Sequence, residues 1–393
     1  MATQQACETR AAPVPAAKRI DSLDALRGLA LLGVLAMNLE TLFRISIFQQ
    51  FVPGPPDPGL DGWVNRFLEV FVDLKALAIF SLLFGIGLCI QHERLAGHPR
   101  RLRLLLRRLL VLLVFGLVHL YLIWNGDILT EYAVAGFVVL PFLYGPTWAL
   151  ALGATGFLAL FLAGPMLPPW VPFPSQAWLI HHIRIANHVY GSGSFGEILA
   201  FRIKEVDAFL SLHDFIFPRT VGLFLLGALT WRLGVVQNAP RHIGALGLAA
   251  ALAIATGLTL ILTGVSAFGT IVLALGYAAL VIAVGSGRGG PWLAWAEPVG
   301  RMAFTNYIAQ SVILGWIFYG YGLGLFGRMS SSSGLLLVLG LYAVQALWSR
   351  WWLQRFAFGP IEWLWRALMY GRRPPFRKAG RLQTAPGRPF QNW

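Results

Sequence analysis

Long apolar segments recur along the whole chain and are separated by polar connections. A helix that crosses a bilayer needs about 20 mostly apolar residues. By that criterion the sequence predicts ten spans, at about 23–43, 67–91, 104–124, 128–145, 147–165, 215–233, 243–264, 267–286, 300–319 and 334–353. We therefore expect an all-α polytopic membrane protein, a bundle of about ten transmembrane helices.

The connections divide the chain into five expected parts. They are a disordered cytoplasmic tail at 1–20, an N-terminal five-helix half at 21–165, an extracytoplasmic segment at 166–214, a C-terminal five-helix half at 215–370 and a basic cytoplasmic tail at 371–393. The extracytoplasmic segment has enough length for an amphipathic helix on the membrane surface. The first outer connection, 44–66, is rich in Pro and Gly, which predicts a loop without regular structure.

Basic residues fall in alternate connections between the predicted spans. They precede the first span, follow the second, sixth and eighth, and follow the tenth, whereas opposite connections such as 125–127 and 264–267 carry almost none. Loops rich in Lys and Arg stay in the cytoplasm, so this alternation predicts that both termini are cytoplasmic. The N-terminal residues lack the features of a cleavable signal. We expect a multi-pass protein of the bacterial inner (plasma) membrane.

The amino-acid composition also indicates that the lipid bilayer is a partner of the chain. The chain is 57% hydrophobic and only 12% charged, about half the charged fraction of a soluble protein. In a soluble protein, a net charge of +14 would favour binding to nucleic acid. Here the basic residues lie mostly in the connections and the tail, where they set the orientation of the helices in the membrane. We therefore expect no nucleic-acid partner. Cys7 and Cys89 form no disulfide framework, and the absence of metal-ligand spacing predicts no metal. The oligomeric state is not specified.

One histidine, His119, lies well inside a predicted span, about one turn below the outer surface. Asp127 and Glu131 follow at a spacing that brings them to a similar depth. An imidazole beside a carboxylate is what a general base needs, because the acid fixes the tautomer and stabilises the imidazolium. The three are candidate catalytic residues. A structural histidine bonded to a neighbouring helix is the other interpretation, and both stay open.

The ninth predicted span begins with several hydrogen-bonding side chains, Thr305, Asn306, Gln310 and Ser311. Each needs a partner away from lipid. Contacts between helices are one interpretation. The other is a polar lining for a substrate or a developing oxyanion, with Asn38, Asn306, Tyr307 and Gln310 as the candidate residues.

Charged residues near the cytoplasmic side are candidates for binding a phosphorylated cofactor. Asp24 and Arg27 are one turn apart at the start of the first span, which equally suits a simple ion pair. Arg103, Arg107 and Arg108 begin the third span. Guanidinium groups match phosphate oxygens, although membrane topology explains these arginines equally well.

Six stretches together resemble the DUF418 (YeiB-like) family of bacterial membrane proteins. They are residues 24–38, which begin Asp24-Ala25-Leu26-Arg27-Gly28, and residues 80–85, 116–129, 217–227, 300–327 and 358–366. From about residue 230 the chain resembles the domain that names the family. The family in turn is similar to transmembrane acyltransferases of the heparan glucosaminide N-acetyltransferase type, and shares with them the pattern of Asp24, Arg27 and Asn38.

The resemblance implies that acyl-CoA, for example acetyl-CoA, binds from the cytosol near the five charged residues above. Its acyl group would pass to a small-molecule or glycan acceptor on the far side of the membrane. The lysosomal relatives use a histidine in the first outer loop, and residues 44–66 contain none. His119, oriented by Asp127 or Glu131, is then the intramembrane candidate for the base.

Two other classes of function remain open. In a secondary transporter, His119 and the carboxylates would form a proton relay, but the two halves show no convincing internal repeat of the kind many transporters have. A non-catalytic membrane scaffold or sensor is the third class, supported by the absence of a strong catalytic signature such as a Walker loop or an HExxH motif.

Overall fold

The computed structural model describes residues 20–54 and 57–378, and in this part of the chain all regular elements are helices. Eight of them are long and apolar enough to cross a membrane, and two shorter apolar helices accompany them, α5 (Leu129–Tyr144) and α13 (Ala303–Phe318). Each predicted span coincides with one of these ten helices. The predicted all-α polytopic membrane protein is confirmed. Most of both predicted tails, with Cys7, lies outside the described residues.

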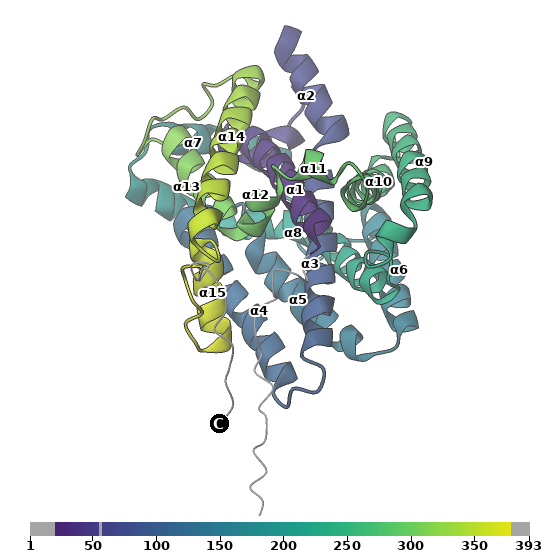
Figure 1. Ribbon diagram of the computed structural model, residues 1–393. Coiled ribbons are helices and arrows are strands. Elements are labelled where there is room, and N and C mark those ends of the chain that lie inside the picture. Colours follow the sequence, from purple (N-terminus) through teal and green to yellow (C-terminus); the bar gives the residue numbers. More distant parts are fainter. Residues whose placement is uncertain (1–19, 55–56, 379–393) are drawn as a thin grey trace, which may run out of the picture.

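The N-terminal half contains α1 (Asp21–Asn38), α2 (Gly59–Phe71), α3 (Lys75–Arg94), α4 (Arg101–Val118), α5 and α6 (Thr147–Ala163), with the short helical turns η2 (Leu39–Phe43), η3 (Ile47–Phe51), η4 (His119–Ile123) and η5 (Gly164–Met166). The remainder contains α7 (Gln176–Ser192), α8 (Phe195–Arg232), η6 (Ala239–Arg241), α9 (Ile243–Leu262), α10 (Ser266–Ser286), α11 (Gly290–Leu293), α12 (Glu297–Arg301), α13, α14 (Ser331–Arg355) and α15 (Pro360–Tyr370). Figure 1 shows α1 in the middle of the bundle, where it contacts α3, α10, α12, α13 and α14.

The expected extracytoplasmic segment, 166–214, is largely helical. It contains α7 and the first half of α8, which begins at Phe195 and not near residue 215. The start of α8 is fixed by a capping box, in which Ser194 and Glu197 each accept a hydrogen bond from the other's backbone amide. Polar residues of this segment, such as His182 and Glu205, are buried against the bundle. Their polarity therefore reflects hydrogen bonding inside the protein, and the expectation that this segment has room for a helix agrees with α7 and the start of α8.

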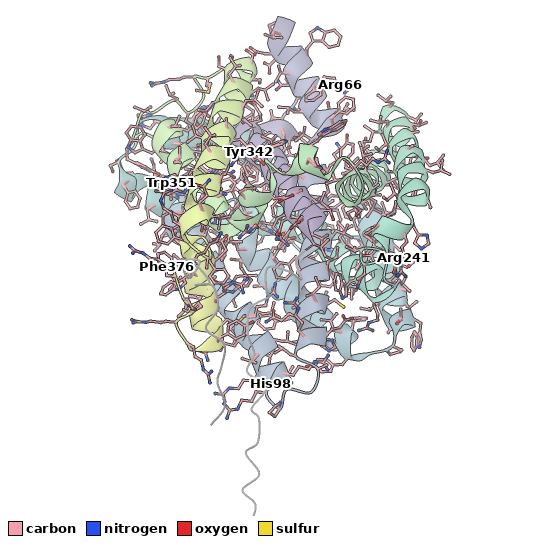
Figure 2. All side chains as sticks on the ribbon, in the orientation of Figure 1. Arg66, His98, Arg241, Tyr342, Trp351 and Phe376 are labelled. Atoms are coloured by element: carbon pink, nitrogen blue, oxygen red, sulfur yellow. The ribbon has the colours of Figure 1, made fainter. Side chains whose placement is uncertain are left out.

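Part of the first outer connection, 44–66, is also regular. It contains the 3₁₀ turn η3, and α2 begins inside it at Gly59. The expectation of a loop without regular structure was therefore wrong for these residues. α2 projects from one end of the bundle (Figure 1). Arg66 on α2 and His98 after α3 lie at opposite ends of the molecule (Figure 2), so α2 and α3 together span its length.

Glycines allow two helix crossings to become very close. At the crossing of α3 and α8, a Cβ atom on Gly85 would lie 2.0 Å from the Phe224 carbonyl oxygen, and one on Gly227 would lie 2.1 Å from that of Leu82. The crossing of α1 and α12 has the same reciprocal form, with Gly28 and Gly300. Small residues let membrane helices pack through their backbones. These crossings hold α1, α3, α8 and α12 in a fixed arrangement.

The buried cluster nearest the polar residues joins helices from both halves. It includes Leu35 of α1, Phe43 of η2, Trp124 after η4, and Tyr307 and Phe318 of α13. The rings of Phe43 and Trp124 are stacked, with their centroids 4.5 Å apart. Apolar packing thus encloses the segment around His119 on several sides.

Candidate functional site

A histidine, a carboxylate and a hydroxyl group form one buried chain of hydrogen bonds. The Nδ1 atom of His119 lies 2.8 Å from Oδ1 of Asp127, and its Nε2 atom lies 2.9 Å from Oγ of Ser311. The exposed fractions of His119, Asp127 and Ser311 are 0%, 2% and 2%. We call these three residues the triad. Hydrogen bonds in such a low-dielectric interior are electrostatically stronger than in water.

The backbone changes helix type at His119. α4 ends at Val118, η4 continues as one π-helical turn, and Trp124 then extends the chain. Gly116 allows α4 to approach α5, because a Cβ atom there would lie 2.5 Å from the backbone nitrogen of Thr130. Single π-helical turns are rare and occur often at functional sites. This local geometry turns the chain so that Asp127 returns to His119.

The two carboxylate oxygens of Asp127 have separate partners. Oδ1 faces His119, and Oδ2 accepts a hydrogen bond of 2.7 Å from the backbone amide of Thr130, in the first turn of α5. An acidic side chain is favoured there because the free amides and the helix dipole attract negative charge. The position of Asp127 therefore favours a proton on Nδ1 of His119, which leaves Nε2 as a hydrogen-bond acceptor.

Helix α13 carries Ser311, the hydroxyl member of the triad, and Tyr307, which packs against His119. Tyr307 and Ser311 lie one turn apart on this helix, and the Tyr307 ring lies 5.1 Å from that of His119, centroid to centroid. The Ser311 hydroxyl is also 3.3 Å from the Tyr307 carbonyl oxygen. Both π-helical turns of the described residues, η2 and η4, contact α13. Ser311 is thus held by its own helix and directed at His119.

Glu131 lies apart from the triad. Its Oε2 is 2.6 Å from Nδ1 of His213, and its Oε1 accepts a hydrogen bond of 2.5 Å from the Thr220 hydroxyl. Both partners belong to α8. Of the two carboxylates considered from the sequence, Asp127 is the one bonded to His119.

The predicted polar lining of α13 mostly connects this helix to α14. The Asn306 amide donates to the Ser349 hydroxyl at 2.9 Å, and the Gln310 amide donates to Oε1 of Gln345 at 2.8 Å. Asn38 is buried at the end of α1, where η2 begins. For Asn306 and Gln310, these contacts match the interpretation that the polar residues of α13 form hydrogen bonds between helices. Tyr307 differs, because its ring lies against His119.

The predicted donor-binding residues include one ion pair and two exposed arginines. The Arg27 guanidinium donates to Oδ1 of Asp24 at 2.9 Å, as an i,i+3 pair on α1. Arg103 and Arg107 are exposed on α4. The Arg107 guanidinium lies beside Gly371, the residue that follows α15.

Arg108 is half-buried where α3, α4 and α15 meet. Its guanidinium donates to Oε1 of Gln91 and lies over the rings of Phe84 and Trp365, at 5.4 and 5.1 Å from their centroids. Arg107 precedes Arg108 on the same helix but is exposed.

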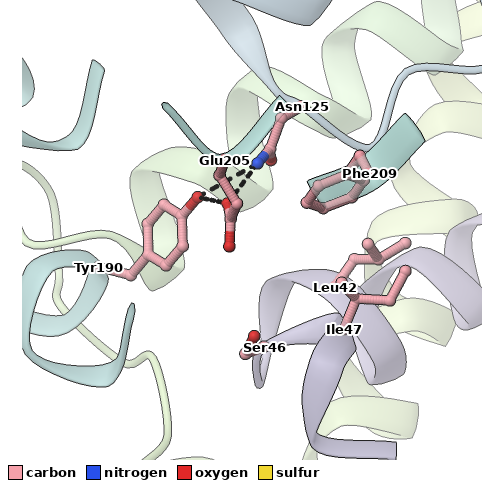
Figure 3. A pocket seen from close by; sticks show the side chains of 7 residues that line it. All are labelled: Leu42, Ser46, Ile47, Asn125, Tyr190, Glu205 and Phe209. Atoms are coloured by element: carbon pink, nitrogen blue, oxygen red, sulfur yellow. Dashed lines mark hydrogen bonds between the residues drawn. The ribbon is translucent and has the colours of Figure 1, made fainter. Parts of the chain in front are cut away.

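A second polar cluster, formed by Asn125, His182, Tyr190 and Glu205, lies next to the triad. Glu205 accepts hydrogen bonds from the Asn125 amide at 2.5 Å and from the Tyr190 hydroxyl, and its Oε1 lies 2.7 Å from Nε2 of His182. Figure 3 shows Asn125, Tyr190 and Glu205 around a small hollow of about 10 Å³, which is about the room that one water needs. Asn125 connects this cluster to the triad, because it lies between His119 and Asp127 in the chain.

Two features of this region were missed from the sequence. Ser311 was noted only as one of several polar residues of its helix, and its closeness to His119 joins positions far apart in the chain. His182, Glu205 and His213 were assigned to a connecting segment. Histidines and carboxylates recur in that segment, but their spacing does not show which of them pair or that they are buried.

The fold and the site define a polytopic α-helical membrane protein with a buried His–carboxylate–hydroxyl set. The chain belongs to the DUF418 family, whose description is "Protein of unknown function (DUF418)" and whose model matches residues 226–372. That range includes Ser311 on α13 but not His119 or Asp127.

Two relatives extend the similarity over nearly the whole chain. The protein YxaH of Bacillus subtilis (strain 168) is 33% identical over 92% of this chain and 96% of its own. The protein YeiB of Escherichia coli (strain K12) is 28% identical over 88% of this chain and 95% of its own. The resemblance to a YeiB-like DUF418 protein, expected from the sequence, is thus confirmed.

Proposed function

We propose that the protein is a transmembrane acyltransferase of the bacterial inner membrane. It would take an acyl group from acyl-CoA on the cytosolic side and transfer it to a hydroxyl or amine acceptor on the other side. The observation that supports this most is the bond between His119 and Asp127, which prepares Nε2 of a buried histidine to accept a proton. A positioned general base contributes about 10²- to 10⁴-fold to such reactions.

His119 serves as the base in the proposed reaction. Its Nε2 takes the proton of the attacking hydroxyl or amine, the attacking atom bonds to the thioester carbonyl carbon, and the carbon–sulfur bond breaks. The imidazolium then gives its proton to the CoA thiolate. Asp127 holds the imidazole and stabilises its charged form, while Tyr307 packs against its ring.

The arginines at the expected cytoplasmic end suit the phosphate groups of the donor. Arg103 and Arg107 are exposed on α4, and Arg108 and Arg27 are half-buried. Guanidinium groups bind phosphate oxygens through paired hydrogen bonds. The proposal therefore assigns the nucleotide part of acyl-CoA to this end and its thioester to the triad. Both termini would be cytoplasmic.

Binding of acetyl-CoA to the detergent-purified protein tests the donor site. We expect micromolar binding by calorimetry, and we expect Arg107→Ala to weaken it about tenfold, because one charge-assisted hydrogen bond contributes about 1.5 kcal/mol. Arg66→Ala is the control, since Arg66 is an exposed arginine at the opposite end of the molecule (Figure 2). Failure to bind acetyl-, propionyl- and palmitoyl-CoA would reject the proposal.

A proton-coupled transporter is the second candidate, favoured by one observation. Three histidine–carboxylate pairs, His119–Asp127, His182–Glu205 and His213–Glu131, lie in one region of the bundle. In proteoliposomes containing a pH-sensitive dye, a transporter would dissipate a pH gradient, and Glu131→Gln would abolish this flux. That result, together with no binding of acyl-CoA, would favour transport over acyl transfer.

A further inference from the structure

We propose that Ser311 is a nucleophile that carries the acyl group as a covalent ester between donor and acceptor. This inference rests on the proposed acyl transfer and adds an intermediate to it. Its basis is the order of the hydrogen bonds, in which Asp127 faces Nδ1 of His119 and the Ser311 hydroxyl faces Nε2. The same order of acid, imidazole and hydroxyl activates serine nucleophiles on unrelated folds, and it is recognised by geometry and not by sequence position.

The hydrogen-bond lengths favour His119 as the acceptor of the Ser311 proton. Oγ of Ser311 lies 2.9 Å from Nε2 of His119 but 3.3 Å from the Tyr307 carbonyl, the usual acceptor for a helix serine. Ser81 on α3 shows the contrast. It is equally buried and donates to the Leu77 carbonyl at 2.9 Å, and its other neighbour is the hydroxyl of Tyr132.

The neighbours of Ser311 are consistent with its activation as a nucleophile. A serine hydroxyl is a weak nucleophile unless a base removes its proton. Here the base is already within hydrogen-bond distance, and Asp127 is positioned to stabilise the imidazolium that results. All three side chains are enclosed by protein.

A covalent intermediate also fits the expected topology of the reaction. Donor and acceptor approach from opposite sides of the membrane, and an ester on Ser311 removes the need for both to occupy the buried site together. Covalent catalysis divides one difficult transfer into two easier ones. The π-helical turns η2 and η4 contact α13, the helix that carries Ser311.

The two half-reactions balance. In the first, Oγ of Ser311 bonds to the thioester carbonyl carbon and its proton passes to Nε2 of His119. The carbon–sulfur bond then breaks, and the CoA thiolate takes that proton to leave as the free thiol. In the second, the acceptor hydroxyl or amine gives its proton to His119 and bonds to the acyl carbon. The bond to Ser311 breaks, and Oγ regains the proton.

The test is to trap the ester in the full-length protein. The purified protein is incubated with acetyl-CoA labelled in the acetyl group, without acceptor, denatured with acid and digested for mass spectrometry. Release of CoA thiol is followed in the same samples, with glucosamine and glycerol as probe acceptors. The variants are Ser311→Ala, Ser311→Cys and His119→Ala. Ser81→Ala is the matched control, because it removes another buried helix serine with a carbonyl partner.

We expect a label on the peptide that contains Ser311 in the wild-type protein and in Ser81→Ala, and none in Ser311→Ala or His119→Ala. We expect Ser311→Ala to lower turnover at least 10³-fold while acetyl-CoA binding persists, which shows that the variant is folded. Ser311→Cys should carry the label as a thioester.

Two results would overturn the inference. Turnover in Ser311→Ala within tenfold of the wild-type rate, with no labelled peptide in either protein, means that His119 activates the acceptor directly, and the acyltransferase proposal then stands without the ester. A wild-type protein that binds no acyl-CoA removes both the ester and the acyltransferase proposal.

Discussion

Replacing Asp127 with Asn is expected to lower acyl-transfer turnover about 10⁴-fold, the size of effect seen when an acid that orients a catalytic histidine becomes an amide. The reason lies in the second partner of Asp127. The backbone amide of Thr130 needs an oxygen acceptor, and Oδ2 provides it at 2.7 Å. In the variant the amide oxygen stays with Thr130, so the amide nitrogen faces Nδ1 of His119.

That orientation of the amide changes the tautomer of His119. An amide N–H that donates to Nδ1 requires Nδ1 to be an acceptor, so the ring proton moves to Nε2. Nε2 can then no longer take a proton from Ser311 or from an acceptor. The backbone bond that supports α5 is retained, so we expect the variant to fold and to bind acetyl-CoA with unchanged affinity.

The measurement is CoA release at saturating acetyl-CoA, with binding measured separately by calorimetry. Asp214→Asn is the control, because Oδ2 of Asp214 also accepts a backbone amide, that of Trp170, at 3.0 Å. It should retain wild-type turnover. Turnover of Asp127→Asn within tenfold of the wild type would contradict the assigned role, and an equal loss in Glu131→Gln would favour a relay through both carboxylates.

The spans were predictable because length and hydropathy are local properties of the chain. α9, for example, is expected at 243–264 and observed as Ile243–Leu262. The segment before residue 215 was not predictable by the same means. α7 and the first half of α8 carry His182, Arg202 and Glu205, which are buried inside the protein, and His182 and Glu205 are bonded to each other. Such residues lower the hydropathy of a helix and give it the composition of a loop.

The candidate site was predictable only where its members are near in sequence. His119 and Asp127 are eight residues apart, and the turn between them was enough to place both at a similar depth. Ser311 is 192 residues from His119. Along α13 its spacing does not distinguish it from Asn306 or Gln310, because only the rotation of the helix in the bundle decides which residue faces His119 and which faces α14.

Replacing Gly85 with Ala is expected to lower the free energy of unfolding by about 3 kcal/mol, the upper part of the range for overpacking a buried position. A Cβ atom on Gly85 would lie 2.0 Å from the Phe224 carbonyl oxygen and 2.6 Å from its carbonyl carbon. Both are backbone atoms of α8, so no side-chain rotation relieves the overlap. α3 and α8 would have to separate along their crossing.

Gly87 on the same helix provides a matched control. A Cβ atom there would lie 3.8 Å from the nearest side-chain atom, Nη2 of Arg108, which is ordinary contact. In a helix interior Ala is favoured over Gly by about 0.5–1 kcal/mol, so Gly87→Ala should be neutral or stabilising. Denaturation of the two variants in one detergent, followed by circular dichroism, measures the difference. Equal stability would show that the backbones of α3 and α8 do not meet at Gly85, whereas loss confined to Gly85→Ala would show that their close crossing holds the bundle together.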